Sequence, residues 1–145
     1  MASRHVKTAI VAVVLVALSA CASAPATSSQ RSASSSASRL AQAFDDQESG
    51  LQIEGAGTVK RLLDDDDEGS RHQRFILELE TGQTLLIAHN IDLAERIDTL
   101  EVGDEVQFYG VYEWNPKGGT VHWTHHDPKR QHIGGWLKHN GIVYQ

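Results

Sequence analysis

The feature that most constrains the fold is a succession of short segments in which apolar and polar residues alternate. The clearest example is residues 71–80, where Phe75, Leu77 and Leu79 share one face and mostly polar residues occupy the other. A period of two is typical of a β-strand that buries one face. Turn-forming residues separate this segment from further strand-like segments at residues 57–63, 84–90, 105–114 and 120–126. The sequence therefore predicts a mostly β domain.

The second and third of these segments are close enough to form a hairpin. A three-residue loop at 81–83 would place Leu79 opposite Leu85, Leu77 opposite Ile87 and Phe75 opposite His89. The pairing would keep the apolar residues on one face.

One segment departs from the strand period. In residues 90–100, Leu93, Ile97 and Leu100 follow the helical spacing, and Asp92 with Glu95 forms a possible capping box. We therefore expect one short helix between the third and fourth strands.

Five strands with one helix in that position resemble the OB-fold, a five-stranded Greek-key barrel. The likeness covers residues 51–126 and includes the phrase Leu100-Glu101-Val102-Gly103-Asp104 before the fourth strand. An open five-stranded sheet or one half of a sandwich is the alternative.

Four sequence blocks carry a more specific resemblance: RHQRFILELETGQTLLIAHNIDLA, GDEVQFYGVYEWN, HWTHHDP and GGWLKHNG. Together they resemble a bacterial family defined only as domain of unknown function 3465, over about residues 55–145. The resemblance supports the OB-like fold, and it implies no activity and no catalytic residue.

The first 21 residues have the layout of a lipoprotein signal peptide. Basic residues precede an apolar run at 9–18 that is too short to span a bilayer comfortably, and Leu18-Ser19-Ala20-Cys21 resembles a lipobox. That resemblance implies acylation of Cys21 and attachment to a membrane of the bacterial cell envelope. Ala22, in place of aspartate, favours the outer membrane, with the domain facing the periplasm.

The domain itself is expected to span residues 51–145, including a C-terminal tail. Residues 22–50 are expected to form a tether and lead-in, because eight of the seventeen residues at 22–38 are serine and such a segment cannot bury much apolar surface. Within the lead-in, Leu40, Ala43 and Phe44 could share one side of a short helix.

The barrel topology predicts that polar strand ends meet at one rim. The start of the second strand, the end of the third and the end of the fifth should converge there. Alternation along the fifth strand places Val121 and Trp123 in the core, so that His125 would lie beside His89 at the barrel mouth.

These residues allow three classes of function, of which we favour a binding or accessory module. Its ligand would be a small polar or anionic molecule, an oligosaccharide or a peptide, and another envelope protein is a further candidate partner. The candidate ligand-binding residues are Arg71, His72, Arg74, His89, Asn90, Trp114, Asn115, His122, His125, His126 and Trp136.

A histidine-dependent phosphodiesterase or nuclease, or a metal-dependent hydrolase, is the first alternative, with His89, His122 and His125 as candidate catalytic residues. On a strand, however, His122 and His126 would lie about 13 Å apart, too far to share a metal ion. We therefore expect no metal and no cofactor. The second alternative is a purely structural envelope protein.

Charge disfavours a general nucleic-acid binder. Without the signal peptide the chain holds 11 basic and 19 acidic residues, a formal charge of −8. Residues 114–145 are an exception, because this segment holds four basic residues, Lys117, Lys129, Arg130 and Lys138, and one acidic residue, Asp127.

Overall fold

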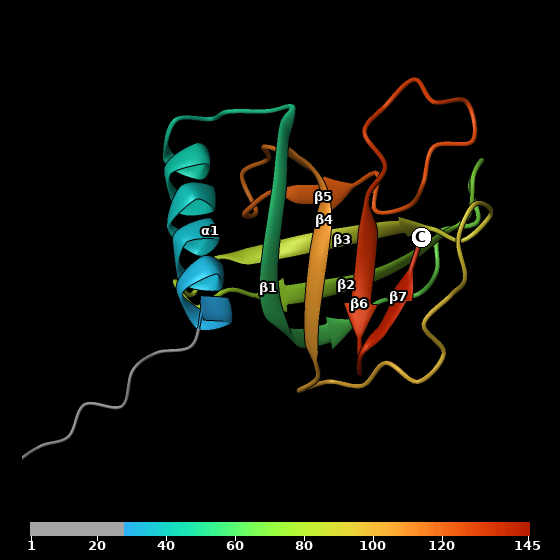
Figure 1. Ribbon diagram of the computed structural model, residues 1–145, viewed down its shortest axis with the longest axis horizontal. Helices are drawn as coiled ribbons and strands as arrows, with labels where there is room; N and C mark the ends of the chain where they lie inside the picture. Colours follow the sequence, from blue (N-terminus) through green and yellow to red (C-terminus); the bar gives the residue numbers. More distant parts are fainter. Residues whose placement is uncertain (1–27) are drawn as a thin grey trace, which may run out of the picture.

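The computed structural model describes residues 28–145. The expected signal peptide and the lipidated Cys21 lie outside these residues. The described elements are α1 (Ser28–Asp45), β1 (Leu51–Leu62), β2 (His72–Glu78), β3 (Thr84–Asn90), β4 (Glu105–Glu113), β5 (Thr120–His122), β6 (Trp136–His139) and β7 (Ile142–Tyr144) (Figure 1).

Five strands close into a barrel in the order β1-β2-β3-β5-β4, with β4 pairing back onto β1. The β3–β5 pair is parallel, and the other pairs of the ring are antiparallel. This confirms the mostly β, OB-like fold and its Greek-key barrel. The buried side chains of the barrel include Phe75, Leu85, Phe108 and Tyr112, all with no exposed surface.

Beyond β5, the edge of β4 is paired by β6. Val111 of β4 pairs with His122 of β5, and two residues along, Tyr109 pairs with Trp136 of β6. Both partners run antiparallel to β4, so β5 and β6 act as one barrel strand interrupted by residues 123–135. We call residues 123–134 the excursion, and it extends from the barrel on the side away from α1 (Figure 1). β7 then pairs with β6 at the edge of the sheet.

Gly135 is required where the chain returns to the barrel. A Cβ atom at this position would lie 2.0 Å from the Trp123 carbonyl oxygen and 2.3 Å from that of Tyr109. Only glycine allows the two backbones to approach so closely.

Helix α1 is longer than the lead-in helix that the sequence suggests. It begins at Ser28, within the serine-rich stretch expected to be a flexible tether, and it carries Ala37, Leu40 and Ala43 into the core. The hydroxyl groups of Ser35 and Ser36 donate to the Ser32 carbonyl, so these serines make local bonds that a helix accommodates. Burial of the apolar face outweighs the weak helix propensity of serine.

The prediction of a short helix between the third and fourth strands is wrong. Residues 91–104 form turns and irregular backbone, and the single described helix is α1. Buried Gln73 explains the difference, because its side-chain amide accepts from the Ile97 N–H and donates to the Ile97 carbonyl. Asp92 does not cap a helix but accepts hydrogen bonds from the backbone and side chain of Arg71.

The β2–β3 hairpin has a different register from the one expected. Leu77 lies opposite Leu85 and Phe75 opposite Ile87, so the partners are shifted by two residues. Gly82, with a φ of 82°, turns the chain within the loop, and its N–H donates to the Leu79 carbonyl. A shift of two leaves every side chain on the same face, so the hydrophobic pattern could not distinguish the two registers.

The fifth strand ends earlier than expected, at His122. Trp123 has a φ of 55°, which breaks the alternation, and its side chain is half-buried instead of lying in the core. Thr124 and His125 are buried in its place.

Candidate ligand-binding face

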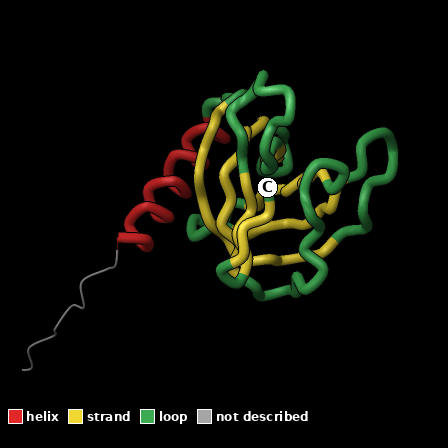
Figure 2. Tube along the Cα trace, turned by 45° about the vertical axis from the view of Figure 1, so that its right-hand side comes forward, coloured by secondary structure: helices red, strands yellow, loops and turns green. Residues whose placement is uncertain are grey.

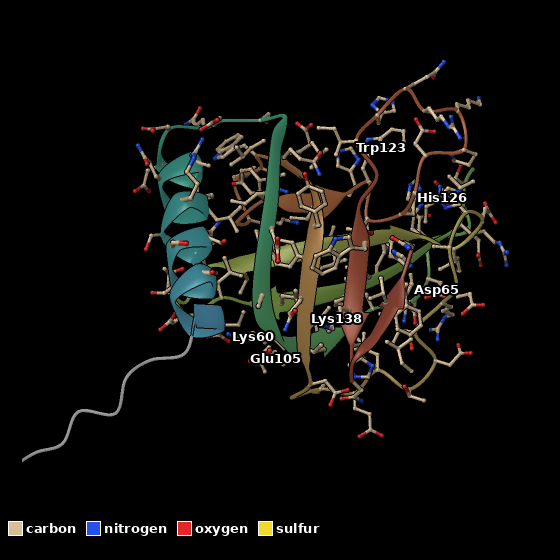
Figure 3. All side chains as sticks on the ribbon, in the orientation of Figure 1. Lys60, Asp65, Glu105, Trp123, His126 and Lys138 are labelled. Carbon is tan, nitrogen blue, oxygen red and sulfur yellow. The ribbon has the colours of Figure 1, made fainter. Side chains whose placement is uncertain are left out.

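The strand ends named by the sequence do meet at the end of the barrel opposite α1. His72 of β2 pairs with Asn90 of β3, and Asp65 and His126 lie at this end in Figure 3. Arg71 is bound to Asp92, whereas the Arg74 Nε atom donates to the Asp64 carbonyl. We call this region the histidine end.

His89 is the central buried group of the histidine end. Its Nε2 atom lies 3.1 Å from the Glu95 carbonyl oxygen and its Nδ1 atom 2.8 Å from Thr124 Oγ1. A carbonyl oxygen can only accept, so Nε2 carries the proton and Nδ1 accepts from the threonine hydroxyl. Desolvation lowers the pKa of His89 to about 4, and the ring is neutral at physiological pH.

This arrangement changes the expected pairing of His89 with His125. Thr124, not His125, bonds to His89, and the His125 Nδ1 donates to the His126 carbonyl at 2.8 Å. Both nitrogens of His89 and one of His125 are thus occupied by internal hydrogen bonds. His89 is a positioning residue that joins β3 to the excursion and to the loop at Glu95, and it is poorly suited to proton transfer.

Two of the candidate binding residues lie at the other end of the barrel. Trp114 donates its indole N–H to the Phe44 carbonyl of α1, at 3.0 Å. The Asn115 side chain accepts from the N–H groups of Lys117 and Gly119 and so shapes the turn before β5. The structure separates Trp114 and Asn115 from the histidine end.

The remaining two candidates, His122 and Trp136, point outward on the same side of the sheet. Val106, Phe108, Gly110 and Tyr112 of β4 are buried, so the residues between them face outward. We call the outward surface of these strands the β4–β6 face, and it includes Gln52, Glu54, Gln107, Tyr109, Val111, Glu113, His122, Trp136 and Lys138.

An aromatic pair forms the centre of the β4–β6 face. Tyr109 and Trp136 are directly paired across the strands, and their ring centroids are 6.3 Å apart with planes inclined by 35°. Both side chains are half-buried. Trp123 and Lys138 lie toward opposite ends of the face in Figure 3.

Two buried polar atoms of this face have no hydrogen-bond partner. They are Gln52 Nε2 and His122 Nε2, on the residues that flank Val111 from β1 and β5. Such atoms are rare in folded proteins because each forfeits the hydrogen bonds that it would make to water. The one other such atom in the described chain, Gln83 Oε1, belongs to an amide whose nitrogen already donates to Gly118.

The surroundings of His122 favour its neutral form. Desolvation lowers its pKa, and Glu113, with Oε1 at 3.7 Å from Nε2, opposes that shift in part. A neutral imidazole offers one donor and one acceptor. Within residues 28–145, no three histidine, cysteine, aspartate or glutamate side chains converge as metal ligands would.

One comparison with known proteins identifies the family. The family described as "Protein of unknown function (DUF3465)" matches residues 21–145. The chain belongs to this family. No curated protein matches the sequence. In this DUF3465 chain, no helix of the described residues is long and apolar enough to span a membrane.

Sequence reasoning missed Gln52, Tyr109, Val111 and Glu113 of the face. The alternation of residues 105–114 already placed Tyr109 outward. Its partner Trp136, however, lies on β6, which the sequence did not indicate as a strand because the excursion interrupts the pattern. The pairing therefore became visible only in the folded chain.

Proposed function

We propose that this DUF3465 chain is a binding module that holds a polyhydroxylated ligand, an oligosaccharide, on the β4–β6 face. The observation that carries the proposal is the pair of unpartnered atoms, Gln52 Nε2 and His122 Nε2, beside the Tyr109–Trp136 pair. A hydroxyl group can accept a hydrogen bond from the glutamine amide. It can also accept from, or donate to, His122 Nε2, depending on which tautomer the neutral histidine adopts.

The aromatic pair supports the same ligand class. A sugar ring has an apolar face of C–H groups that can lie against tyrosine and tryptophan, while the edges of the ring carry the hydroxyls. Amphipathic aromatic side chains suit such a ligand because they offer apolar area and a polar group together. OB-type barrels also commonly bind oligosaccharides.

The dimensions of the face suit a ligand of more than one ring. The β4 partners of His122 and Lys138 are Val111 and Gln107, four residues apart, which corresponds to about 13 Å along a strand. The ligand would thus lie along β4 and β6 and span from His122 to Lys138.

The test is a titration of the full chain in mild detergent with two neutral oligosaccharides, chitotetraose and fully methyl-esterified tetragalacturonate. We expect at least one to quench tryptophan fluorescence saturably and to shift the NMR signals of the Gln52 amide and the His122 ring. Trp136→Ala should weaken this binding at least tenfold, because it removes half of the aromatic pair.

Leu86→Ala is the matched control, since Leu86 is a half-buried, outward-facing residue on β3. It should bind as the wild type does. Equal binding by Trp136→Ala and the wild type, or no binding of either sugar, would contradict the proposal.

We also propose that the module works in the bacterial envelope, anchored through a lipid on Cys21. Seven positions separate Cys21 from Ser28, where α1 begins. Supporting this orientation, α1 lies along one side of the barrel (Figure 2), whereas the excursion extends from the other side (Figure 1), so the excursion would stay clear of the membrane. Labelling with a palmitate analogue should mark the wild type and not Cys21→Ser; labelling of both would contradict lipidation at this residue.

A further inference from the structure

The excursion has a fixed shape of its own, although it leaves the barrel. The Asp127 carboxylate accepts hydrogen bonds from the backbone N–H groups of Lys129, Gln131 and His132. Desolvation opposes ionisation of Asp127, but these three donors outweigh it and lower its pKa. The return of the chain is fixed by the Gly135 N–H, which donates to the His125 carbonyl.

This bracing leaves cations on the outside of the excursion. The one acidic side chain of residues 123–134, Asp127, is turned onto the backbone. Lys129 and Arg130 are exposed, and neither forms an ion pair with any of the residues at 28–145. In a chain of net charge −6, two adjacent unpaired cations on a braced loop are a local exception.

Trp123 connects the excursion to the β4–β6 face. Its ring centroid lies 4.0 Å from that of His132 in the excursion and 6.1 Å from that of His122 on the face. A ligand that extends along the face past His122 therefore meets Trp123 and then the excursion.

Acidic residues lie at the same end of the barrel, and they limit the direction of approach. Asp65 is bound to Arg96 and Asp66 lies 3.8 Å from Arg74, so part of the run at 64–68 is already neutralised. The rest of the run would repel an anion that approached over the β1–β2 loop. The route along the β4–β6 face avoids this loop, but it passes Glu54, which pairs with Tyr109, and Glu113, whose Oε1 atom lies 3.7 Å from His122 Nε2. The acidic groups of a ligand must therefore lie beyond these two carboxylates, at the excursion.

We propose that the ligand of the β4–β6 face is an anionic oligosaccharide, whose neutral ring surfaces rest on Tyr109 and Trp136 and whose acidic groups are bound by Lys129 and Arg130. This inference rests on the proposed function and adds the charge of the ligand. Arginine and lysine are the side chains that best bind carboxylate and phosphate groups, through charge-assisted hydrogen bonds.

The experiment compares tetragalacturonate with its fully methyl-esterified form, which has the same backbone and no charge. The full chain in mild detergent should bind the acidic form about tenfold more tightly, a difference of about 1.4 kcal/mol, because charge-assisted hydrogen bonds are stronger than neutral ones. The double variant Lys129→Gln/Arg130→Gln should lose this preference and keep its affinity for the ester.

The control is Arg61→Gln/Lys117→Gln, which removes the same charge from two other exposed cations that have no ion pair within the described chain. It should retain the preference for the acidic form. A similar loss in both double variants would mean that net charge alone sets the preference, and it would overturn the assignment to the excursion.

The outcomes separate this inference from the proposed function. Binding of both forms with equal affinity, weakened by Trp136→Ala, would overturn the inference and support the proposed function. Tight binding of the acidic form alone, unaffected by Trp136→Ala, would mean that the excursion binds its ligand without the β4–β6 face. This would overturn the claim that one ligand contacts both. If neither galacturonate form bound, the inference would fail, and the proposed function would fail with it only if chitotetraose did not bind either.

Discussion

The two ends of the barrel are closed in different ways. At one end, α1 presses Ala37, Leu40 and Ala43 onto the barrel, and Trp114 adds one hydrogen bond to the helix backbone. At the histidine end the loops are held instead by buried polar side chains. Gln73 holds the loop at Ile97, and His89 joins Glu95 to Thr124.

The difference has a thermodynamic consequence. Burial of apolar surface does not depend on protonation, so the α1 end should be insensitive to pH. The histidine end depends on a neutral imidazole in a desolvated site, so its contribution to stability should change with pH. The comparison can be tested by substituting one central residue at each end.

The largest effect is expected at the α1 end, from Leu40→Ala. Leu40 is fully buried, and replacing such a leucine with alanine costs about 2–5 kcal/mol through lost burial and the cavity that remains. Denaturant unfolding should show this loss equally at pH 7 and pH 5. Leu93→Ala is the control, because Leu93 is 38% exposed, and it should change stability little. A wild-type free energy of unfolding for Leu40→Ala would mean that α1 does not seal the barrel.

The next largest effect is expected from His89→Gln, which tests the buried polar contacts of the histidine end. A glutamine can donate to the Glu95 carbonyl and accept from Thr124, but it does not titrate. The pKa of His89 is about 4 in the folded chain, against the ordinary histidine value of 6.5, so the folded state binds fewer protons than the unfolded chain between these values. The stabilisation by neutral His89 is therefore complete above pH 6.5 and is lost as the pH falls toward 4. The total loss is about 3 kcal/mol.

The measurement is the difference in unfolding free energy between the wild type and His89→Gln from pH 7.5 to 3.5. His122 and the carboxylates titrate in both proteins, so the difference isolates His89. Near pH 7 the two stabilities should agree to within about 1 kcal/mol, and near pH 4 the variant should be the more stable. If the difference in unfolding free energy did not change with pH, His89 would not make the histidine end sensitive to pH.

The two ends also differ in how far they could be predicted. The strands follow from alternation, which is a local pattern, whereas the barrel, its strand order and the convergence of His72, His89 and Asn90 follow from the resemblance to the OB-fold. The loop at 91–104 could not be predicted in this way. Its helical spacing is real, but Gln73, about 24 positions away in the sequence, binds Ile97 and prevents the helix.

The β4–β6 face could not be predicted from the sequence for a similar reason. Alternation beyond His122 predicts a continuing strand, and nothing local indicates that Trp123 adopts a positive φ. The break turns Thr124 inward, where it contacts His89. The next residue to pair with β4 after His122 is therefore Trp136 of β6. His122 and Trp136 could be named as candidates from the sequence, but their common face depends on a pairing that skips the excursion.

A smaller effect is expected from Trp114→Phe, which refines the description of the α1 end. The change keeps an aromatic ring against Phe44 but removes the indole N–H that binds the Phe44 carbonyl. Losing one such hydrogen bond costs about 1 kcal/mol. If thermal unfolding showed a loss comparable to that of Leu40→Ala, the polar contact and not the apolar face would dominate this end.

The smallest effect is expected from Trp123→Ala at the histidine end. An aromatic residue in the core would cost about 3–5 kcal/mol when replaced by alanine, but Trp123 is half-buried and its closest ring contact is to the exposed His132. We expect a loss of about 0.5 kcal/mol, the low end for an aromatic pair, because this pair lies at the surface. Trp123→Gly provides the sharper comparison, because the φ of 55° strains any side chain and glycine adopts it freely. Glycine should therefore be more stable than alanine at this position, the reverse of the order in a strand. If alanine were the more stable in denaturant unfolding, β5 would continue through Trp123, and the excursion would begin later than the structure places it.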